Sequence, residues 1–406
     1  MFKRIIACVV MLVFMFTAVK MPQVAAAPNP DGYDAVTVSK IMANTNVFNL
    51  QAKASVLMEA DTGRVILENA SHERRPIASI TKIMTMLLAM EAIDSGKIEF
   101  DDIVVVSEHA ASMGGSQAYM VVGERFTVHD LLKAIAVQSC NDASVALAEK
   151  IAGSEDAFVT LMNEKAKQLG MNDTYFRDCT GLTDEGHYST AYDVALMSRE
   201  LIMKHPKITE YTTIYYDHLR EGEKKFDLVN TNKLINSYEG ANGLKTGHTN
   251  AAGYCLSATA KRNGMQLIAV VLGEPDNNTR VAECRKMLDY GFANFEVLEI
   301  NKKGDIAQEV EVKKGIERKV NAIYNEDVKL LLEKGEKDKV TKEVILKEEI
   351  QAPIEKDQVL GDVIFKVGEK EVGKTQIIAA EEVKKASFIR LFFRMIVDWF
   401  SFGKNK

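Results

Sequence analysis

The sequence has little cysteine, little tryptophan and no excess of positive charge. Of its 406 residues only 5 are cysteine and 1 is tryptophan, and the formal net charge is −6. This acidic balance argues against nucleic acid as a partner, because nucleic-acid-binding proteins neutralise phosphates with clustered lysine and arginine. A chain of this length can bury a large core without cross-links, and its cysteines are irregularly spaced. We therefore expect free buried thiols at Cys140, Cys179, Cys255 and Cys284.

Patterns for metal and nucleotide binding are also missing. The 7 histidines show none of the spacings typical of metal ligands. Residues 368–375 match the phosphate-binding loop letter for letter, but Glu369 and Glu371 would face the phosphate and no βαβ unit surrounds the segment. We interpret it as a turn between charged strands, and we predict neither a metal nor a cofactor.

Residues 1–26 have the organisation of a secretory signal peptide. Two cations precede an apolar run over 5–19, and small residues follow at 24–27. The apolar run is short for a membrane span. We expect cleavage after Ala26 or Ala27 and secretion across the cytoplasmic membrane, so that the protein acts outside the cytoplasm.

Residues 27–296 mix helical and strand signals. Two strands are predicted around Asn263-Gly264, a dipeptide typical of tight hairpins, and another pair surrounds the turn at 61–63. Hairpins at both ends with helices between them predict an α+β domain with an antiparallel sheet. Helical signals occupy three runs, at 130–137, 142–152 and 158–169.

The composition changes after Glu296. Residues 297–385 become short β-rich segments between lysines, glutamates and glycines, which predicts a small all-β sandwich or barrel that acts as a stalk without a catalytic group. Residues 386–406 form an amphipathic helix with one polar stripe and a wide apolar face. We expect this helix to lie on the outer surface of the cytoplasmic membrane. The alternative is a helix packed on the protein's own core.

Ser79-Ile80-Thr81-Lys82 is the most informative stretch, because it places a hydroxyl and an amine one helical turn apart. An apolar run follows, so the pair is predicted in the first turn of a buried helix. The Lys82 amine can then take the proton from Ser79 Oγ without a histidine. The spacing alone proves little, because Ser401-Phe402-Gly403-Lys404 repeats it at the C-terminus, where we interpret it as accidental.

Two further segments accompany the Ser-Lys pair. Ser139-Cys140-Asn141 lies where one predicted helix ends and the next begins, a position suited to pointing side chains into a cleft. Its plainer interpretation is a helix cap. Lys245-Thr246-Gly247-His248 opens a predicted strand, and an edge strand carrying lysine and threonine suits an extended peptide that ends in a carboxylate. Its plainer interpretation is an ordinary charged edge strand.

Together the segments read Ser-x-x-Lys, Ser-x-Asn and Lys-Thr-Gly, in the order found in penicillin-binding proteins and serine β-lactamases. With their flanking residues they closely resemble the low-molecular-weight D-alanyl-D-alanine carboxypeptidases of the S11 serine peptidase family. The resemblance runs from about Ala54 through the C-terminal tail. It implies a catalytic domain with the penicillin-binding or serine β-lactamase-like fold, a peptidoglycan stem peptide as substrate, and inhibition by β-lactams.

The resemblance also implies roles for individual residues. Ser79 would attack the carbonyl between the two terminal D-alanines, Lys82 would be its general base, and Ser139 would relay a proton to the departing D-alanine. Asn141 would hold the substrate amide and orient Lys82. The backbone N–H groups of Ser79 and His248 would form the oxyanion hole. The residues expected to meet the terminal carboxylate are Lys245, Thr246 and Arg280, the last of which is otherwise a solvated arginine at a helix start.

Two departures and two rival functions remain. Cys140 replaces a small residue common in the family, and Asn242 stands where an aspartate commonly precedes Gly243; both put specificity in doubt rather than the reaction. A serine β-lactamase would use the same motifs, but we find no counterpart of the deacylating glutamate of the class A enzymes. The other rival is a non-catalytic protein that senses β-lactams or binds the cell wall, which the intact Ser79 and Lys82 disfavour.

Overall fold

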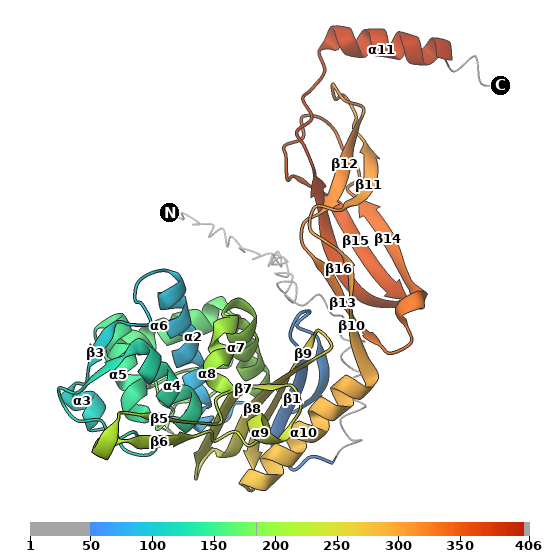
Figure 1. The fold of residues 1–406 in the computed structure, drawn as a ribbon. Helices are drawn as coiled ribbons and strands as arrows, with labels where there is room; N and C mark the ends of the chain where they lie inside the picture. Colours follow the sequence, from blue (N-terminus) through green and yellow to red (C-terminus); the bar gives the residue numbers. More distant parts are fainter. Residues whose placement is uncertain (1–48, 184, 402–406) are drawn as a thin grey trace, which may run out of the picture.

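The computed structural model describes residues 49–401 except Asp184, so the predicted signal peptide and the Ser401–Lys404 repeat lie wholly or partly outside the described residues. A region of mixed helices and strands is followed by a β-rich region, and a separate helix lies at the far end of the β-rich region (Figure 1). This arrangement confirms the predicted fold class, an α+β domain followed by a small β domain and a C-terminal helix.

A five-stranded antiparallel sheet organises the first region. Its order is β2 (Val65–Asn69), β1 (Ala54–Glu59), β9 (Met265–Glu274), β8 (Gly253–Arg262) and β7 (Ala241–Thr249). Strand β1 therefore pairs with β9, a strand more than 200 residues later in the chain. As a result β7, which carries the Lys-Thr-Gly segment, is an edge strand.

The predicted hairpin between β8 and β9 is confirmed at its turn. Asn263 and Gly264 have φ values of 49° and 84°, the left-handed region that a two-residue hairpin requires at both positions. Side chains alternate between the two faces of a strand, and in this sheet each face packs against a hydrophobic core. Val56 of β1 belongs to the core under the helices, whereas Leu57 belongs to the core under α10 (Asn277–Asn294).

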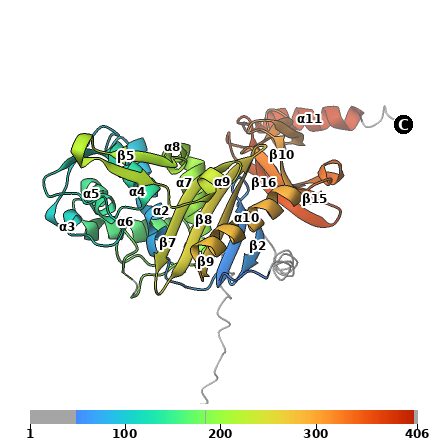
Figure 2. The same cartoon turned by 60° about the horizontal axis from the view of Figure 1, so that its bottom comes forward.

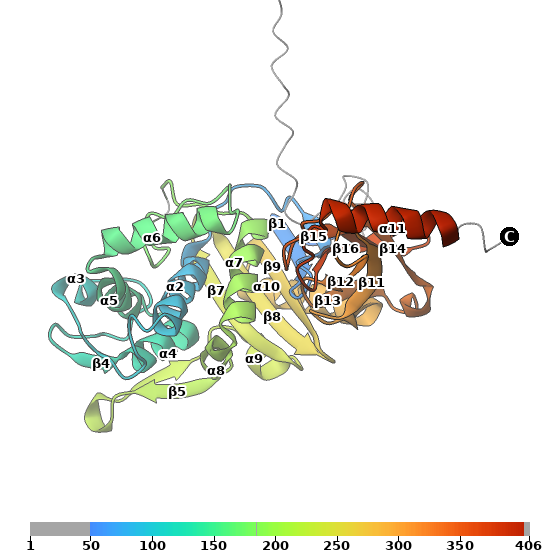
Figure 3. The ribbon, with the colours of Figure 1, turned by 90° about the horizontal axis from the view of Figure 1, so that it is seen from above.

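Helices cover the two faces of the sheet unequally. In Figure 2, α10 crosses one face, where the short helix α9 (Leu234–Ser237) lies beside it and packs into the same core. On the other face α2 (Lys82–Asp94) and α7 (Ala191–Lys204) begin a helical layer that extends away from the β-rich region (Figure 3). The remaining elements of this layer and its hairpins are β3 (Ile103–Val105), α3 (Glu108–Ala111), β4 (Arg125–Thr127), α4 (Val128–Gln138), α5 (Asn141–Ala152), α6 (Glu155–Gln168), η3 (Pro206–Ile208), α8 (Thr209–Thr212), β5 (Tyr216–Leu219), η4 (Gly222–Lys224) and β6 (Phe226–Val229).

The β-rich region contains two sheets around a core of its own. One pairs β10 (Phe295–Asn301) with β13 (Val328–Glu333), and the other has the order β11-β12-β16-β15-β14. The segment that resembles a phosphate-binding loop is the tight turn between β15 and β16, as we interpreted it. The strands of the second sheet are β11 (Ile306–Glu311), β12 (Lys319–Tyr324), β14 (Val340–Leu346), β15 (Val359–Val367) and β16 (Lys370–Ala379), with η5 (Lys337–Lys339) before β14.

The C-terminal helix α11 (Phe388–Ser401) lies apart from both cores (Figure 1). Among the residues that the structure describes, no helix combines the length and the apolar composition needed to cross a membrane. The four cysteines within these residues are free and buried, as the sequence predicts.

Candidate active site

The Ser-Lys pair lies at the entrance to α2. Ser79 belongs to a 3₁₀ turn, η2 (Ala78–Thr81), and α2 begins at Lys82. In a 3₁₀ turn the side chains three residues apart are eclipsed, which brings the two groups together. Lys82 Nζ lies 3.0 Å from Ser79 Oγ, with the serine half-buried and the lysine fully buried. The structure thus forms the predicted contact, with a tighter first turn than the predicted α-helix.

Lys82 has two further hydrogen-bond partners. Its Nζ donates to Asn141 Oδ1 at 2.6 Å and to the backbone carbonyl oxygen of Thr180 at 2.8 Å. Both oxygens can only accept, because a side-chain amide oxygen and a carbonyl oxygen carry no hydrogen. A neutral Lys82 has two N–H bonds and one lone pair. Asn141 and Thr180 use the two hydrogens, so the lone pair faces Ser79 Oγ.

Burial lowers the pKa of Lys82 to about 8, because its environment disfavours the charged ammonium. The acidic groups of Cys179, Asp178, Cys140 and Asp142 act in the opposite direction and limit the shift. A lysine with this pKa is partly neutral near neutral pH, whereas an ordinary lysine is almost entirely charged. About a tenth of the amine is therefore neutral at pH 7 and can act as a general base.

The Ser-x-Asn segment forms the second wall. Helix α4 ends at Gln138, its C-cap residue Ser139 turns the chain sharply with a φ of 64°, and α5 begins at Asn141. Neither side chain caps a helix, because the residue at the N-cap of α5 is Cys140 and it makes no side-chain cap hydrogen bond. Ser139 Oγ is buried without a hydrogen-bond partner among the described residues. This hydroxyl is thus available to a bound substrate, and the plain capping interpretation is wrong.

The Lys-Thr-Gly segment on β7 forms the third wall. Gly247 is required by space, because a Cβ there would lie 2.7 Å from the carbonyl oxygen of Ile77. Lys245 is buried, and its Nζ donates to the carbonyl of Thr246 at 2.8 Å. Burial, followed by the positive charges of Lys82 and Arg280, holds the pKa of Lys245 well below its ordinary value. An anion that binds beside such a buried lysine stabilises the charged form of its amine.

His248 and Arg280 make contacts that hold β7 in place. The exposed imidazole of His248 stacks on Tyr254 with the ring centroids 4.1 Å apart, so the ring packs away from Lys82 and its partners. Arg280 is only 6% exposed, and its Nη1 donates to the carbonyls of Gly247 at 3.0 Å and Cys255 at 3.1 Å. Arg280 is therefore a buried charge behind the Lys-Thr-Gly segment, and the interpretation as a solvated arginine is wrong.

The sequence analysis missed the loop that supplies the Thr180 carbonyl. The carboxylate of Asp178 accepts hydrogen bonds from the backbone N–H groups of Thr180 at 2.7 Å, Gly181 at 2.6 Å and Thr183 at 2.9 Å. Burial alone would raise the pKa of Asp178, but His187 and these hydrogen bonds outweigh it and lower the pKa to about 2. An Asp followed closely by Thr and Gly is a turn signal, although nothing in it indicates contact with a lysine.

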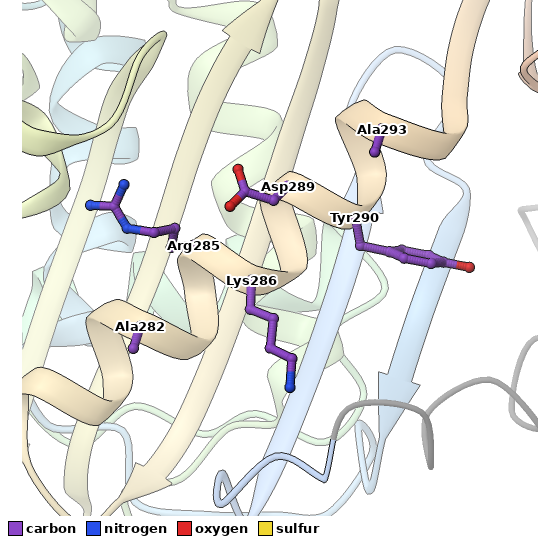
Figure 4. A pocket seen from close by; sticks show the side chains of 6 residues that line it. All are labelled: Ala282, Arg285, Lys286, Asp289, Tyr290 and Ala293. Carbon is purple, nitrogen blue, oxygen red and sulfur yellow. The ribbon is translucent and has the colours of Figure 1, made fainter.

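A hollow of about 430 Å³ on the outer flank of α10 is not part of this site. Figure 4 shows its six lining side chains along one side of that helix. Helix α10 covers the face of the sheet opposite to α2, which carries Lys82. The lining holds a lysine, an arginine and an aspartate without a buried nucleophile, so the chemistry belongs to the cleft around Ser79.

Residues 39–276, more than half of the chain, match the family model of the D-alanyl-D-alanine carboxypeptidases, peptidase S11. The chain belongs to this family. It is a serine peptidase with D-Ala-D-Ala carboxypeptidase activity, the reaction for which the three walls of the cleft are built. Residues 295–385 match a second model, the C-terminal domain of penicillin-binding protein 5.

Curated and solved relatives of this carboxypeptidase agree with the family. The chain is 49% identical over 354 residues to D-alanyl-D-alanine carboxypeptidase DacF of Bacillus subtilis, covering 87% of this chain and 91% of DacF. Penicillin-binding protein 5 of Haemophilus influenzae superposes with a TM-score of 0.79 at 31% identity, covering 83% of this chain and 98% of that protein. Penicillin-binding protein D2 of Listeria monocytogenes, solved in an ampicillin-bound form, superposes with a TM-score of 0.55 at 32% identity and covers 60% and 99% of the two chains.

The structure also locates the two departures from the family pattern. Cys140 is fully buried, and burial raises the pKa of its thiol above the ordinary value. It is therefore an apolar packing residue between two functional neighbours. The side-chain amide of Asn242 bonds Thr259 at 2.8 Å and Gln266 at 2.9 Å, which ties β7 to β8 and β9. Both residues support the walls of the cleft.

Proposed function

We propose that Ser79 is the nucleophile and Lys82 its general base in the removal of the terminal D-alanine from peptidoglycan stem pentapeptides. Ser79 Oγ attacks the carbonyl carbon of the penultimate D-alanine while Lys82 Nζ takes the hydroxyl proton. The peptide C–N bond then breaks, and the departing amine receives a proton through Ser139. Water hydrolyses the resulting ester of Ser79 and releases the shortened peptide. The observation that carries this proposal is the distance of 3.0 Å between Lys82 Nζ and Ser79 Oγ, together with two pure acceptors that use the hydrogens of a neutral Lys82 amine.

Substrate recognition is assigned to the edge strand β7. An exposed strand edge binds an extended peptide through its backbone groups, and the terminal carboxylate would then meet Lys245 and Thr246. Arg280 adds a positive charge behind Gly247, which favours the same carboxylate. The second amide hydrogen of Asn141, beyond the one donated to Gly114 at 2.7 Å, is available to the substrate. The backbone N–H groups of Ser79 and His248 would bind the oxyanion.

β-Lactams are expected to acylate the same serine. The support is the likeness to the Listeria protein in its ampicillin-bound form, together with the contact of 3.0 Å between Ser79 Oγ and the Lys82 amine. Residues 178–183 supply a carbonyl to Lys82 rather than a free carboxylate, since Asp178 is saturated by backbone N–H groups. Because the carboxylate of Asp178 is occupied in this way, we expect it not to activate water, so that deacylation is slow and β-lactams inhibit the enzyme.

The test uses the chain without its first 26 and last 21 residues, incubated with a pentapeptide ending in D-Ala-D-Ala. Free D-alanine is expected from the parent and from Ser95→Ala, a control serine at the other end of α2, but not from Ser79→Ala. Penicillin should block the release by labelling Ser79. Release of D-alanine by Ser79→Ala would contradict the assignment of the nucleophile, and rapid penicillin hydrolysis by the parent would indicate a β-lactamase.

We further propose that the protein is secreted and that α11 lies on the outer surface of the cytoplasmic membrane, with the β-rich region as a stalk. The support is the orientation of α11. Arg394 on its polar side donates to the carbonyls of Gly315 at 2.9 Å and Ile316 at 2.8 Å. The apolar side chains of Phe388 and Phe393 are 83% and 62% exposed. The polar side therefore faces the β-rich region, and the apolar side is left for lipid.

Membrane association is tested by deleting residues 386–406. The shortened protein is expected in the soluble fraction of cells, with its D-alanine release intact, because α11 is remote from the cleft (Figure 1). The control Arg394→Ala keeps the apolar side and should stay on membranes. Tight membrane association of the shortened protein would contradict the proposed anchor.

A further inference from the structure

A groove of about 580 Å³ lies between residues 118–124 and the β5–β6 hairpin, a volume in the range of ligand pockets. Both segments lie at the end of the molecule that carries α3, away from the β-rich region (Figures 1 and 3). The established chemistry at Ser79 does not use them. The residues that line the groove are Ala118, Tyr119, Val121, Val122, Gly123, Glu124, Arg220, Glu223, Lys224, Lys225 and Phe226.

Each of the two segments that form the walls of the groove starts near a contact with an active-site residue. In the first wall, the carbonyl of Gly114 accepts from Asn141 Nδ2 at 2.7 Å, and the carbonyl of Ser116 accepts from the Asn141 N–H at 2.7 Å. In the second wall, β6 leads directly to Thr231, whose hydroxyl accepts from Thr246 Oγ1 at 2.7 Å. The two segments that line the groove are therefore direct continuations of segments that contact the active site.

Tyr119 is the unusual residue in the groove. Its side chain is 67% exposed, and its φ of 52° is a conformation that costs energy for a bulky residue. Such strain persists only where the surroundings impose it, and it is concentrated at ligand clamps and active sites. The neighbouring Val121 and Val122 are 65% and 54% exposed, so an apolar patch faces solvent beside the cleft. Exposed apolar patches with polar rims mark binding sites.

Two charged side chains impose the conformation of Tyr119. The fully buried carboxylate of Asp142, next to Asn141 in the chain, accepts from the N–H groups of Ala118 at 2.9 Å and Met120 at 3.1 Å. On the other side, the guanidinium of Arg220 donates to the carbonyls of Ala118 at 3.0 Å and Tyr119 at 3.3 Å. The backbone on both sides of Tyr119 is thus held in place, and its ring is directed by the fold.

Arg220 also fixes the width of the groove. Its Nε and Nη2 donate to the carboxylate of Glu124 at 2.6 and 2.9 Å, so one side chain of the hairpin holds three residues of the opposite wall. Across the groove, the ring of Tyr119 packs edge-on against Phe226 with centroids 5.9 Å apart. The groove is therefore preformed, which lowers the entropy lost on binding.

We propose that this groove binds the residues of the stem peptide that precede the terminal D-Ala-D-Ala. The proposal rests on the function assigned above and names how the same site recognises the rest of its substrate. Tyr119 comes five residues after Gly114, so it lies at most ~18 Å from the Asn141 contact. The three residues that precede the terminal D-Ala-D-Ala span roughly 10 Å when extended, and their side chains lengthen the reach toward Tyr119. The apolar floor suits aliphatic side chains, and Glu223 and Lys224 on the rim suit a peptide that carries both signs of charge.

The experiment compares kcat/KM for two substrates in the soluble chain: a pentapeptide ending in D-Ala-D-Ala, and an acylated tripeptide with the same ending that is too short to reach Tyr119. Binding energy from remote substrate groups appears in kcat/KM. For Tyr119→Ala the ratio of pentapeptide to tripeptide kcat/KM is expected to fall about tenfold. Ile306→Ala, which removes an equally exposed apolar side chain from the β-rich region, should leave the ratio unchanged.

The variant Tyr119→Gly distinguishes the contribution of the tyrosine ring to substrate binding from the cost of the strained backbone at residue 119. Glycine adopts a positive φ at no steric cost, so this variant should melt at a higher temperature than Tyr119→Ala while losing the same tenfold preference. Unchanged ratios in both variants, with D-alanine release and penicillin labelling of Ser79 intact, would overturn the groove proposal and leave the proposed function standing. A third substrate, the pentapeptide joined to its sugar, tests whether the glycan occupies the groove instead. If the Tyr119 variants lose activity on this substrate alone, the glycan binds in the groove and the proposal is overturned.

Discussion

The catalytic region and the β-rich region treat buried polar groups in opposite ways. Among the described residues, those from 49 to 294 bury many polar and charged side chains, including Lys82, Lys245 and Arg280, whereas beyond residue 294 the only residue of this kind is Thr375. In the β-rich region the lysines and glutamates form surface pairs such as Lys366 with Glu343. Both regions contain many charged side chains, but only the catalytic region buries some of them.

The difference indicates which region performs chemistry. Burying a charge costs stability unless partners compensate, so a fold retains buried lysines where their altered pKa is useful. The β-rich region has a well-packed apolar core and no such groups, as expected of a structural spacer. This contrast between the two regions can be tested by changing one residue at a time.

The largest effect is expected from two lysine-to-alanine variants. Lys82→Ala should lower the rate of D-alanine release by roughly 10³-fold, because a positioned general base contributes about 10²–10⁴-fold. Lys366→Ala removes an exposed lysine of the β-rich region, where a surface pair contributes at most about 1 kcal/mol, and should leave the rate unchanged. A similar loss of activity in both variants would mean that burial does not distinguish the two lysines.

The second prediction concerns pH. Because burial lowers the pKa of Lys82 to about 8, its neutral form increases about tenfold per pH unit below pH 8 and saturates above it. The rate constant for acylation of Ser79 by excess penicillin should follow the same curve, measured in single-turnover reactions between pH 5.5 and 9.5. A rate that is flat from pH 6 to 9 would exclude Lys82 as the titrating base.

Much of the fold was predictable because local chemistry and long-range packing agree. The Asn263-Gly264 turn requires two left-handed residues, which few other dipeptides provide, and the hairpin forms as predicted. The walls of the cleft were likewise predictable, since Ser79, Asn141 and Lys245 belong to three recurring motifs.

The rest was not predictable because it depends on contacts between distant segments. The Thr180 carbonyl reaches Lys82 across 98 residues, and it is a backbone group that no motif encodes. The capping interpretation of Ser139 was wrong because the residue type favours a cap, whereas the observed φ of 64° directs the chain elsewhere. The burial of Arg280 depends on carbonyls of β7 and β8, which its own helix does not reveal.

The third prediction tests the loop that holds the Thr180 carbonyl. Above pH 3.8 the ionised Asp178 is stabilised by its partners in the folded state, and this stabilisation is lost as pH falls through its folded pKa of about 2. Asp178→Asn should therefore cost about 2 kcal/mol of unfolding free energy at pH 7, and less at pH 2. It also removes a negative charge near Lys82, so the midpoint of the acylation profile should move below pH 8. Urea unfolding at both pH values and single-turnover acylation provide the measurements.

Glu221→Gln serves as the matched control, because Glu221 is an exposed acid on the β5–β6 hairpin that leaves Lys82 and its partners untouched. It should shift neither the unfolding free energy nor the acylation midpoint. An Asp178→Asn protein with the parent's acylation profile would show that the loop is merely structural and does not tune the base.

The smallest effect is expected at the junction of the two regions. Arg64 is buried between them, and its Nη1 donates to the carbonyls of Leu331 at 2.9 Å and Val372 at 3.4 Å. A hydrogen bond from a charged group contributes about 1.5–3 kcal/mol when its acceptor is buried, so Arg64→Ala should destabilise the docking of the regions by about 1–2 kcal/mol. Because Arg64 touches none of the partners of Lys82, kcat for the pentapeptide should stay at the parent value.

In calorimetry of the Arg64→Ala variant, the β-rich region should unfold as a separate, earlier transition. A drop in kcat without such a transition would show that the spacer influences the chemistry, and the contrast between an enzymatic and a structural region would no longer hold.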